Sequence, residues 1–472
     1  MPSRITLVSG SWHSDGMTER VVIENAAIAT VDAADTEIPS GHVVAEGNLI
    51  VAVGAGQAPT YTDGMPTRLV DGTGHLVTPG LVNTHHHFFQ WVTRGLVQNG
   101  TLFEWLVGLY PIWARIDEAV VYAAARGSIT SLLVSGCTTA ADHHYIFPHG
   151  SGDLLGAEIR AARELGLRFH ATRGSMDRGT SDGGLPPDFA VESITAILDA
   201  TEQAVRTHHD PSPGSMICVG VAPCSPFSVS TDLLRQAADL ARGLGVRLHT
   251  HGSETVEEEQ YCQDLFGMGP TDYLDTVGWL GPDVWMAHCV HLDDADIGRF
   301  AATGTGVAHC PSSNARLGAG IARLPEMLAA GIPVGLGVDG TASNEYGSLG
   351  AEVRAALLFA RARKGPAALT VRQALRLATA GGARVLGRED EIGTVEVGKL
   401  ADLALWRLDG PEQSSIADPL AALVLGAPPP LRLLLVDGRV VVEDGRPTTV
   451  DADEVAHEAR EQARRLMALA GR

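Results

Sequence analysis

The feature of this sequence that most limits its fold is a unit that recurs eight times between residues 76 and 390. Each unit has a short apolar run, a polar or Gly/Pro-containing stretch, and an Ala/Leu/Arg-rich pattern with helical spacing. In chain order the runs read "LVTPGLVNTHHH", "CTTAADHHY", "LRFHATRGSM", "MICVGVAPCSPF", "VRLHTHGSE", "VWMAHCVHL", "GVAHCPSSN" and "VGLGVDGTASN". This repetition predicts an α/β fold of the (β/α)8 TIM barrel type. An open doubly wound sheet is the alternative, but no G-x-G-x-x-G turn follows the first run.

Almost every apolar run ends in His, Asp, Glu, Arg or Ser. In TIM barrels the active site is built at the C-terminal ends of the strands. We therefore expect these polar side chains to form a ring around one site.

The two ends of the chain have a different pattern from the middle. Residues 1–75 contain short alternating strands such as "RVVIENAAIATVD", and residues 391–450 repeat the pattern in "LRLLLVDGRVVVEDGRP". Both ends are expected to build one small β-sandwich beside the barrel of residues 76–390. Residues 451–472 begin with Asp and continue with helical apolar spacing, which predicts a C-terminal helix.

The composition disfavours several classes of partner. Asp and Glu (56) outnumber Lys and Arg (35), giving a formal charge of -21 with no long basic cluster, so nucleic acid and anionic membranes are not expected partners. No signal-peptide pattern and no run of about 18 apolar residues occurs, so we expect a cytoplasmic protein. The six cysteines lie apart without a CxxC pair, which fits reduced thiols.

Two pairs of histidines end the first and fifth runs. Residues two apart face the same side of a strand, so His85 and His87 can converge on one ion. A lone H-x-H also fits an incidental polar cluster, and partners are needed to decide. In "HTHGSE" His251 is the better ligand, while His249 fits a core position and a substrate-facing position equally well.

Asp339 closes the apolar segment of the eighth run, where an unpaired carboxylate would be costly to bury. Alone it would fit a helix N-cap. Together with His85, His87 and His251 it offers three imidazoles and one carboxylate, which suit one divalent ion, Zn²⁺ or Fe²⁺. Such an ion lowers the pKa of a bound water from about 15.7 towards about 7.

Three residues complete a hydrolytic site. Asp339 is placed to take the proton of the water, and Glu254 to deliver a proton to a ring nitrogen or leaving group. His288 is placed to polarise the attacked C=N or C=O unit. The expected chemistry is addition followed by elimination.

Other histidines and aromatic residues fit structural roles better than ligand roles, with one of the aromatic residues lining the pocket. They are His143, His144, His291, His309, Trp105, Tyr110 and Trp113.

The stretches "PGLVNTHHH", "HTHGSE", "AHCVHL" and "GLGVDGTASN" resemble the amidohydrolase superfamily, in its branch of aminohydrolases and chlorohydrolases. The resemblance covers nearly the whole chain. Longer stretches, among them "THHHFFQWVTRGL" and "SGCTTAADHHYIFPHG", look like the bacterial 8-oxoguanine deaminases. The resemblance implies the same metal ligands, proton shuttle and polarising histidine as above. It adds three substrate contacts, Gln90, Arg173 and Asn314.

The resemblance also implies one metal ion, because two-metal relatives carry a bridging lysine where this chain has "VGVAPCSPF". It implies hydrolytic deamination of a small nitrogen heterocycle, 8-oxoguanine to urate or a similar purine or pterin, by an enzyme that forms homo-oligomers. The alternatives are a triazine-type hydrolase that releases an alkylamine or halide, a deaminase of isocytosine or a pterin, and a non-catalytic scaffold.

Two departures from the 8-oxoguanine group bear on the substrate. Gly252 and Ser253 stand where those deaminases usually carry Leu-Ala, and "VQNGT" before "LFEW" is short. Both departures could reshape the pocket.

Overall fold

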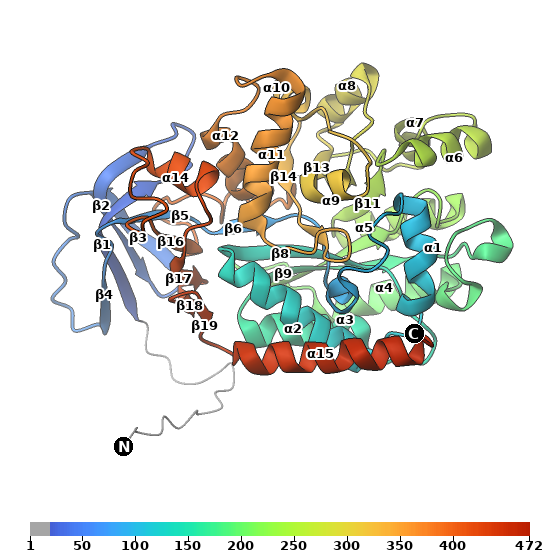
Figure 1. Cartoon of the computed structure of the whole chain (residues 1–472), viewed down its shortest axis with the longest axis horizontal. Coiled ribbons are helices and arrows are strands. Elements are labelled where there is room, and N and C mark those ends of the chain that lie inside the picture. Colours follow the sequence, from blue (N-terminus) through green and yellow to red (C-terminus); the bar gives the residue numbers. More distant parts are fainter. Residues whose placement is uncertain (1–18) are drawn as a thin grey trace.

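The computed structural model describes residues 19–472, and the part of the expected N-terminal β-rich segment before residue 19 lies outside them. Eight parallel strands form a closed barrel (Figure 1). In chain order they are β6 (Leu81–Asn83), β8 (Cys137–His144), β9 (Arg168–Ser175), β10 (Ile217–Pro223), β11 (Leu248–Gly252), β12 (Val284–His288), β13 (Gly306–His309) and β14 (Val334–Leu336). Each predicted run supplies one strand of the barrel. The TIM barrel is confirmed, and because β14 pairs with β6 the sheet has no open edge.

Helices follow the strands and cover the outside of the barrel. They are α2 (Glu118–Val134), α3 (Leu154–Leu165), α4 (Ile194–His208), α5 (Thr231–Leu244), α6 (Val256–Phe266), α7 (Pro270–Thr276), α8 (Asp294–Thr303), α9 (Pro311–Arg316), α10 (Leu324–Ala329), α11 (Leu349–Lys364), α12 (Val371–Arg376), η4 (Leu377–Gly381) and α13 (Gly382–Val385). Their limits follow local chemistry. Ser230, for example, accepts a hydrogen bond from the backbone of Leu233 at the start of α5, and Gly245 ends that helix with φ +70°.

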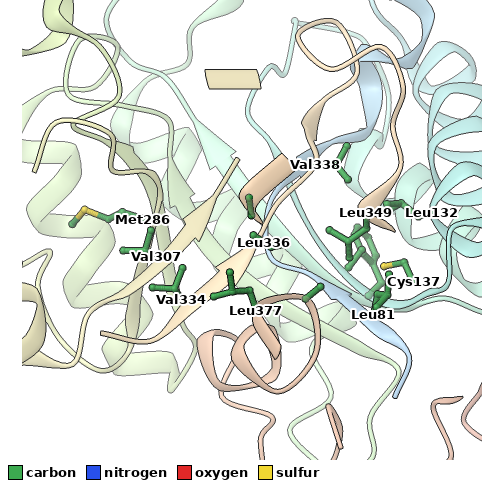
Figure 2. Close-up of a cluster of buried hydrophobic side chains, with 14 of the residues drawn as sticks. Leu81, Leu132, Cys137, Met286, Val307, Val334, Leu336, Val338, Leu349 and Leu377 are labelled. Atoms are coloured by element: carbon green, nitrogen blue, oxygen red, sulfur yellow. The ribbon is translucent and has the colours of Figure 1, made fainter. Parts of the chain in front are cut away.

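The main hydrophobic core lies between the barrel strands and these helices. Figure 2 shows Val307 of β13, Val334 and Leu336 of β14, and Leu349 of α11 among its members. Each of these side chains is at most 3% exposed. Full burial of one such side chain stabilises the fold by roughly 1.5–3 kcal/mol, so the barrel is a stable support for the loops at its rim.

Both ends of the chain meet in one nine-stranded sheet with the order β19-β18-β17-β16-β5-β1-β2-β3, and β4 pairs with β1. The strands are β1 (Arg20–Ala29), β2 (Glu37–Glu46), β3 (Leu49–Ala55), β4 (Thr67–Asp71), β5 (His75–Pro79), β16 (Leu403–Arg407), β17 (Leu431–Val436), β18 (Arg439–Glu443) and β19 (Arg446–Pro447). Antiparallel pairing of β5 with β16 joins the two halves, which share one core. Hydrogen bonding therefore makes this β-domain a single continuous sheet.

The first run of the sequence pattern divides at Gly80. Residues up to Pro79 belong to the sheet, and Leu81 begins the barrel. A Cβ at position 80 would lie 2.2 Å from the side chain of Thr138, so only glycine permits this close approach. The sheet thus extends past residue 75, to Pro79. One apolar run holds two strands that pair with different partners, and the periodicity of the sequence does not reveal this division.

The chain ends in α15 (Ala452–Leu469), which packs along α2 (Figure 1). An ion pair between Arg126 and Glu458 joins the two helices. None of the helices in residues 19–472 combines the length and apolarity that a membrane crossing requires.

Candidate active site

A short strand pair at the rim of the barrel brings the first and eighth runs together. Strands β7 (His86–His87) and β15 (Asp339–Gly340) pair in parallel, with Asp339 opposite His86. As a result, Oδ1 of Asp339 lies 3.2 Å from Nε2 of His85 and 3.3 Å from Nε2 of His87. His251, at the end of β11, completes the group, with its Nε2 3.2 Å from Nε2 of His87.

Backbone carbonyls fix the tautomers of two of these histidines. Nδ1 of His87 lies 2.6 Å from the carbonyl oxygen of His143, and Nδ1 of His251 lies 2.6 Å from that of Cys224. A carbonyl only accepts, so each Nδ1 must donate. In the neutral imidazoles Nε2 therefore carries a lone pair that faces the centre of the site.

The imidazole of His249, and not a backbone carbonyl, fixes the tautomer of His85. Nδ1 of His249 lies 2.9 Å from the carbonyl oxygen of Trp285 and must donate to it, so Nε2 of His249 accepts. That Nε2 lies 2.7 Å from Nδ1 of His85, which therefore donates. His249, whose role the sequence left open, is thus a buried hydrogen-bonded support of His85.

This donor set fits a divalent metal ion. Two imidazole lone pairs 3.2 Å apart, beside a carboxylate oxygen, repel one another unless a cation lies between them. The distances of 3.2–3.3 Å also match the spacing of ligands that each lie about 2.0–2.1 Å from one ion. Imidazole nitrogen with carboxylate oxygen is a ligand set typical of zinc.

Two serines that the sequence analysis missed hold the carboxylate in place. Oδ2 of Asp339 accepts hydrogen bonds from Ser313 (2.6 Å) and Ser343 (3.2 Å). Burial raises the pKa of Asp339, but the adjacent imidazoles of His85 and His87 outweigh this effect and hold the pKa well below its usual value. Both serines lie in polar segments that follow strands, "CPSSN" and "GTASN". That position is the feature of the sequence that could have marked them as site residues.

Glu254 and His288 lie next to this group. Nε2 of His288 is 3.6 Å from Oε2 of Glu254 and 4.0 Å from Oδ2 of Asp339. Burial, together with the negative charge of Asp339, raises the pKa of Glu254 well above its usual value, which favours a form able to donate a proton. Asn314 accepts a hydrogen bond from Nδ1 of His288 at 2.9 Å and so sets the orientation of its ring.

A pocket opens beside these residues. It is lined by His87, Gln90, Leu102, Trp105, Leu106, Tyr110, Tyr145, Cys224, Ser225, Phe227, His251, Glu254, His288, Leu317 and Asp339. Gln90, on the 3-10 helix η1 (Phe88–Thr93), is fully buried, and neither atom of its amide has a hydrogen-bond partner among residues 19–472. A Cβ at position 340 would lie 1.8 Å from Oε1 of Gln90, so Gly340 makes room for this amide.

Arg173 and Asn314, which the resemblance implied as substrate contacts, do not line the pocket. Arg173 forms two hydrogen bonds with Glu192, of 2.8 and 2.9 Å, and its guanidinium lies over the ring of Phe147. Asn314 acts on His288 instead. The sequence placed both after strands but could not show which partner each side chain would meet.

The Gly252–Ser253 departure also lies outside the pocket. A Cβ at position 252 would meet Met286 and Leu274 at 3.1 and 3.3 Å. The hydroxyl of Ser253 lies 3.4 Å from that of Thr271. This departure therefore does not change the pocket wall directly.

Two of the three aromatic residues expected mainly in the core, Trp105 and Tyr110, line the pocket. Trp113 is fully buried and donates to Thr93. His143 and His144 are fully buried as well, and each is hydrogen-bonded within the protein.

The model of the Amidohydrolase family matches residues 76–441, and the chain belongs to this family. The protein is therefore a hydrolase, built as a TIM barrel with the site at its rim. The 8-oxoguanine deaminase of Pseudomonas aeruginosa is 44% identical over 94% of this chain and 98% of its own. Isoxanthopterin deaminase from an unknown prokaryotic organism is 38% identical over 92% of this chain and 93% of its own.

A solved structure gives the same result for the fold. The crystal structure of atrazine chlorohydrolase from Arthrobacter aurescens, complexed with zinc, superposes with a TM-score of 0.88 at 33% identity. The match covers 94% of this chain and 100% of that chain. The barrel and its β-domain are thus shared with an enzyme that binds zinc.

Proposed function

We propose that this protein is a metal-dependent aminohydrolase that deaminates 8-oxoguanine to urate. The observation that carries the proposal is a cluster of lone-pair-bearing imidazoles beside Asp339, with Glu254 and His288 in the same pocket. In it, Nε2 of His85 and of His87 lie beside Asp339, and Nε2 of His251 lies beside that of His87. The similarity to 8-oxoguanine deaminase supports this choice of substrate.

His85, His87, His251 and Asp339 would hold one divalent ion, with Zn²⁺ as the first candidate and Fe²⁺ as the second. The zinc in the similar chlorohydrolase structure supports this choice. When bound, the ion supplies a water whose pKa is lowered to about 7, so hydroxide is available at neutral pH.

The side chains of this chain would then move the protons. Asp339 accepts a proton as water adds to the amine-bearing carbon, and Glu254 delivers one to the neighbouring ring nitrogen. His288, held at Nδ1 by Asn314 and facing the two carboxylates with Nε2, would polarise the attacked unit. Asp339 would then return its proton to the amino group, the C–N bond breaks with release of ammonia, and the hydroxyl proton passes to Glu254 as the carbonyl forms.

A second candidate is hydrolysis of a triazine with release of an alkylamine or halide, and the chlorohydrolase structure is the observation that favours it. Deamination of isocytosine or a pterin is related chemistry, favoured by the match to isoxanthopterin deaminase. The same water and carboxylates serve all of these reactions, because pocket contacts select the leaving group.

We further propose that the enzyme acts in the cytoplasm, as a homo-oligomer, on free heterocycles. A formal charge of -21 disfavours binding to polyanions such as nucleic acid.

The test is ammonia release by the zinc-loaded protein against 8-oxoguanine, guanine, isocytosine, isoxanthopterin, hydroxyatrazine and a chlorotriazine, with metal content measured on the same sample. We expect 8-oxoguanine to give the highest kcat/KM and Asp339→Asn to be inactive. Faster turnover of another ring, or release of chloride or alkylamine, would replace the proposed substrate. A metal-loaded protein inactive on the whole panel would reject deamination.

A further inference from the structure

One wall of the pocket contains a polar group that no contact within residues 19–472 explains. Helix α1 (Leu102–Trp113) contributes four lining residues, of which Leu102 and Leu106 are aliphatic. The indole N–H of Trp105 already donates to the carbonyl of Ala342. Tyr110 is 1% exposed, and its hydroxyl has no hydrogen-bond partner among residues 19–472.

The hydroxyl of Tyr110 is not needed for packing. Its ring lies edge-on to Trp113, with centroids 5.9 Å apart, a contact that the ring makes without the oxygen. Two other aromatic residues have partners for their polar atoms: Trp113 donates to Thr93, and Tyr122 donates to Glu164. Leaving a buried hydroxyl unpaired costs stability, so such groups call for a ligand or another specific role.

The two tyrosines that line the pocket lie at different distances from Asp339. The ring of Tyr145, another lining residue, lies 5.0 Å from that of His87. Burial and, among other groups, the charge of Asp339 raise the pKa of Tyr145, whereas burial and Cys224 raise the pKa of Tyr110, so Tyr110 lies farther from Asp339 than Tyr145 does. A substrate whose reacting carbon lies at Asp339 would therefore present its far edge to Tyr110.

We propose that Tyr110 is a specificity-determining residue whose hydroxyl donates a hydrogen bond to the oxygen on C8 of 8-oxoguanine. This inference rests on the proposed function. The amino group leaves from C2 of the six-membered ring, and C8 lies at the opposite end of the purine, on the five-membered ring. With C2 at the catalytic carboxylates, the C8 oxygen would lie at the end of the purine farthest from Asp339, within reach of the hydroxyl of Tyr110. Guanine lacks this oxygen and would leave the hydroxyl of Tyr110 unpaired.

The experiment compares Tyr110→Phe with wild type as zinc-loaded enzymes, measuring kcat/KM for 8-oxoguanine and for guanine. Tyr122→Phe is the matched control, because it also removes one phenolic oxygen but lies outside the pocket. We expect Tyr110→Phe to lose roughly 10- to 100-fold on 8-oxoguanine and less than about 3-fold on guanine. Tyr122→Phe should keep the wild-type ratio. Metal content and Tm report whether each variant is folded and loaded.

An equal loss on both purines, or no loss on 8-oxoguanine, would overturn the role of Tyr110 while leaving the deaminase function intact. A wild-type enzyme that does not deaminate 8-oxoguanine would overturn both proposals. If guanine turnover is too slow to follow, Kd values for the two purines are measured in a Glu254→Gln background, with and without Tyr110→Phe. The ratio of Kd values should then change by a similar factor.

Discussion

Nε2 of His249 accepts a hydrogen bond from Nδ1 of His85, with 2.7 Å between the two nitrogens. His249 is itself fixed, because it donates to the carbonyl of Trp285 and stacks on the indole with centroids 4.4 Å apart. A metal-binding histidine usually donates to a carboxylate, a carbonyl or water. Here an imidazole takes that place and keeps the lone pair of His85 directed into the site.

We predict that His249→Ala weakens metal binding by roughly 10- to 100-fold, the usual cost of losing a partner of a metal ligand. His85 would then be free to adopt the other tautomer. His249→Gln, which can still offer an acceptor, should lose less. The measurement is the Kd for zinc by competition with a chelator. His42→Ala, in the β-domain, is the control, and unchanged zinc affinity in His249→Ala would contradict the role of His249.

Ser313 should matter more than the serine beside it. The hydroxyl of Ser313 donates to Asp339, whereas Ser312 uses its backbone N–H to donate to Glu352. We expect Ser313→Ala to lower kcat or zinc affinity by about 10-fold, because Asp339 loses the shorter of its two serine contacts. Ser312→Ala should stay within about 2-fold of wild type. Equal effects of the two changes would show that Ser313 does not position the carboxylate.

Replacement of Glu254 by Gln removes the proton that the proposed mechanism delivers to the ring nitrogen. We expect kcat to fall by roughly 10²- to 10⁴-fold, the usual contribution of general acid-base catalysis. Zinc content should stay at the wild-type value, because Glu254 is not among the proposed ligands. Near-wild-type turnover by a metal-loaded Glu254→Gln enzyme would remove Glu254 from this role.

Glu258 should make stability depend on pH. It is fully buried and accepts a hydrogen bond from the backbone N–H of Glu254, and burial raises its pKa from 4.5 to about 8. A carboxyl group whose pKa is raised by folding stabilises the fold most below its unfolded pKa. That contribution is lost as the pH rises towards the folded pKa. Wild type should therefore lose stability between about pH 5 and pH 8 relative to Glu258→Gln.

The measurement is Tm at several pH values between 5 and 8, at one fixed zinc concentration because bound metal also shifts Tm. Glu258→Gln can still accept the hydrogen bond from the backbone of Glu254 through its amide oxygen. As the pH rises, the Tm of Glu258→Gln should therefore increase relative to that of wild type. Glu257→Gln, next to Glu258 but only partly buried, is the control. A Tm difference that does not change with pH would show that ionisation of the Glu258 carboxyl group does not destabilise the fold.

The sequence by itself determined the barrel and the residue types of its rim. Eight apolar runs with polar ends are local patterns, because the spacing of apolar side chains decides whether a segment forms a strand or a helix. The H-x-H spacing likewise places His85 and His87 on one side without any tertiary information.

The tertiary structure decided which atoms face each other. The tautomers of His85, His87 and His251 depend on acceptors in other runs, at His249, His143 and Cys224. Those distances exist only once the barrel has closed. For the same reason Arg173 turns to Glu192 instead of the pocket, and the hydroxyl of Tyr110 meets no hydrogen-bond partner in the described part of the chain. Local periodicity specifies elements, whereas hydrogen-bond partners far apart in the chain are set by how those elements pack.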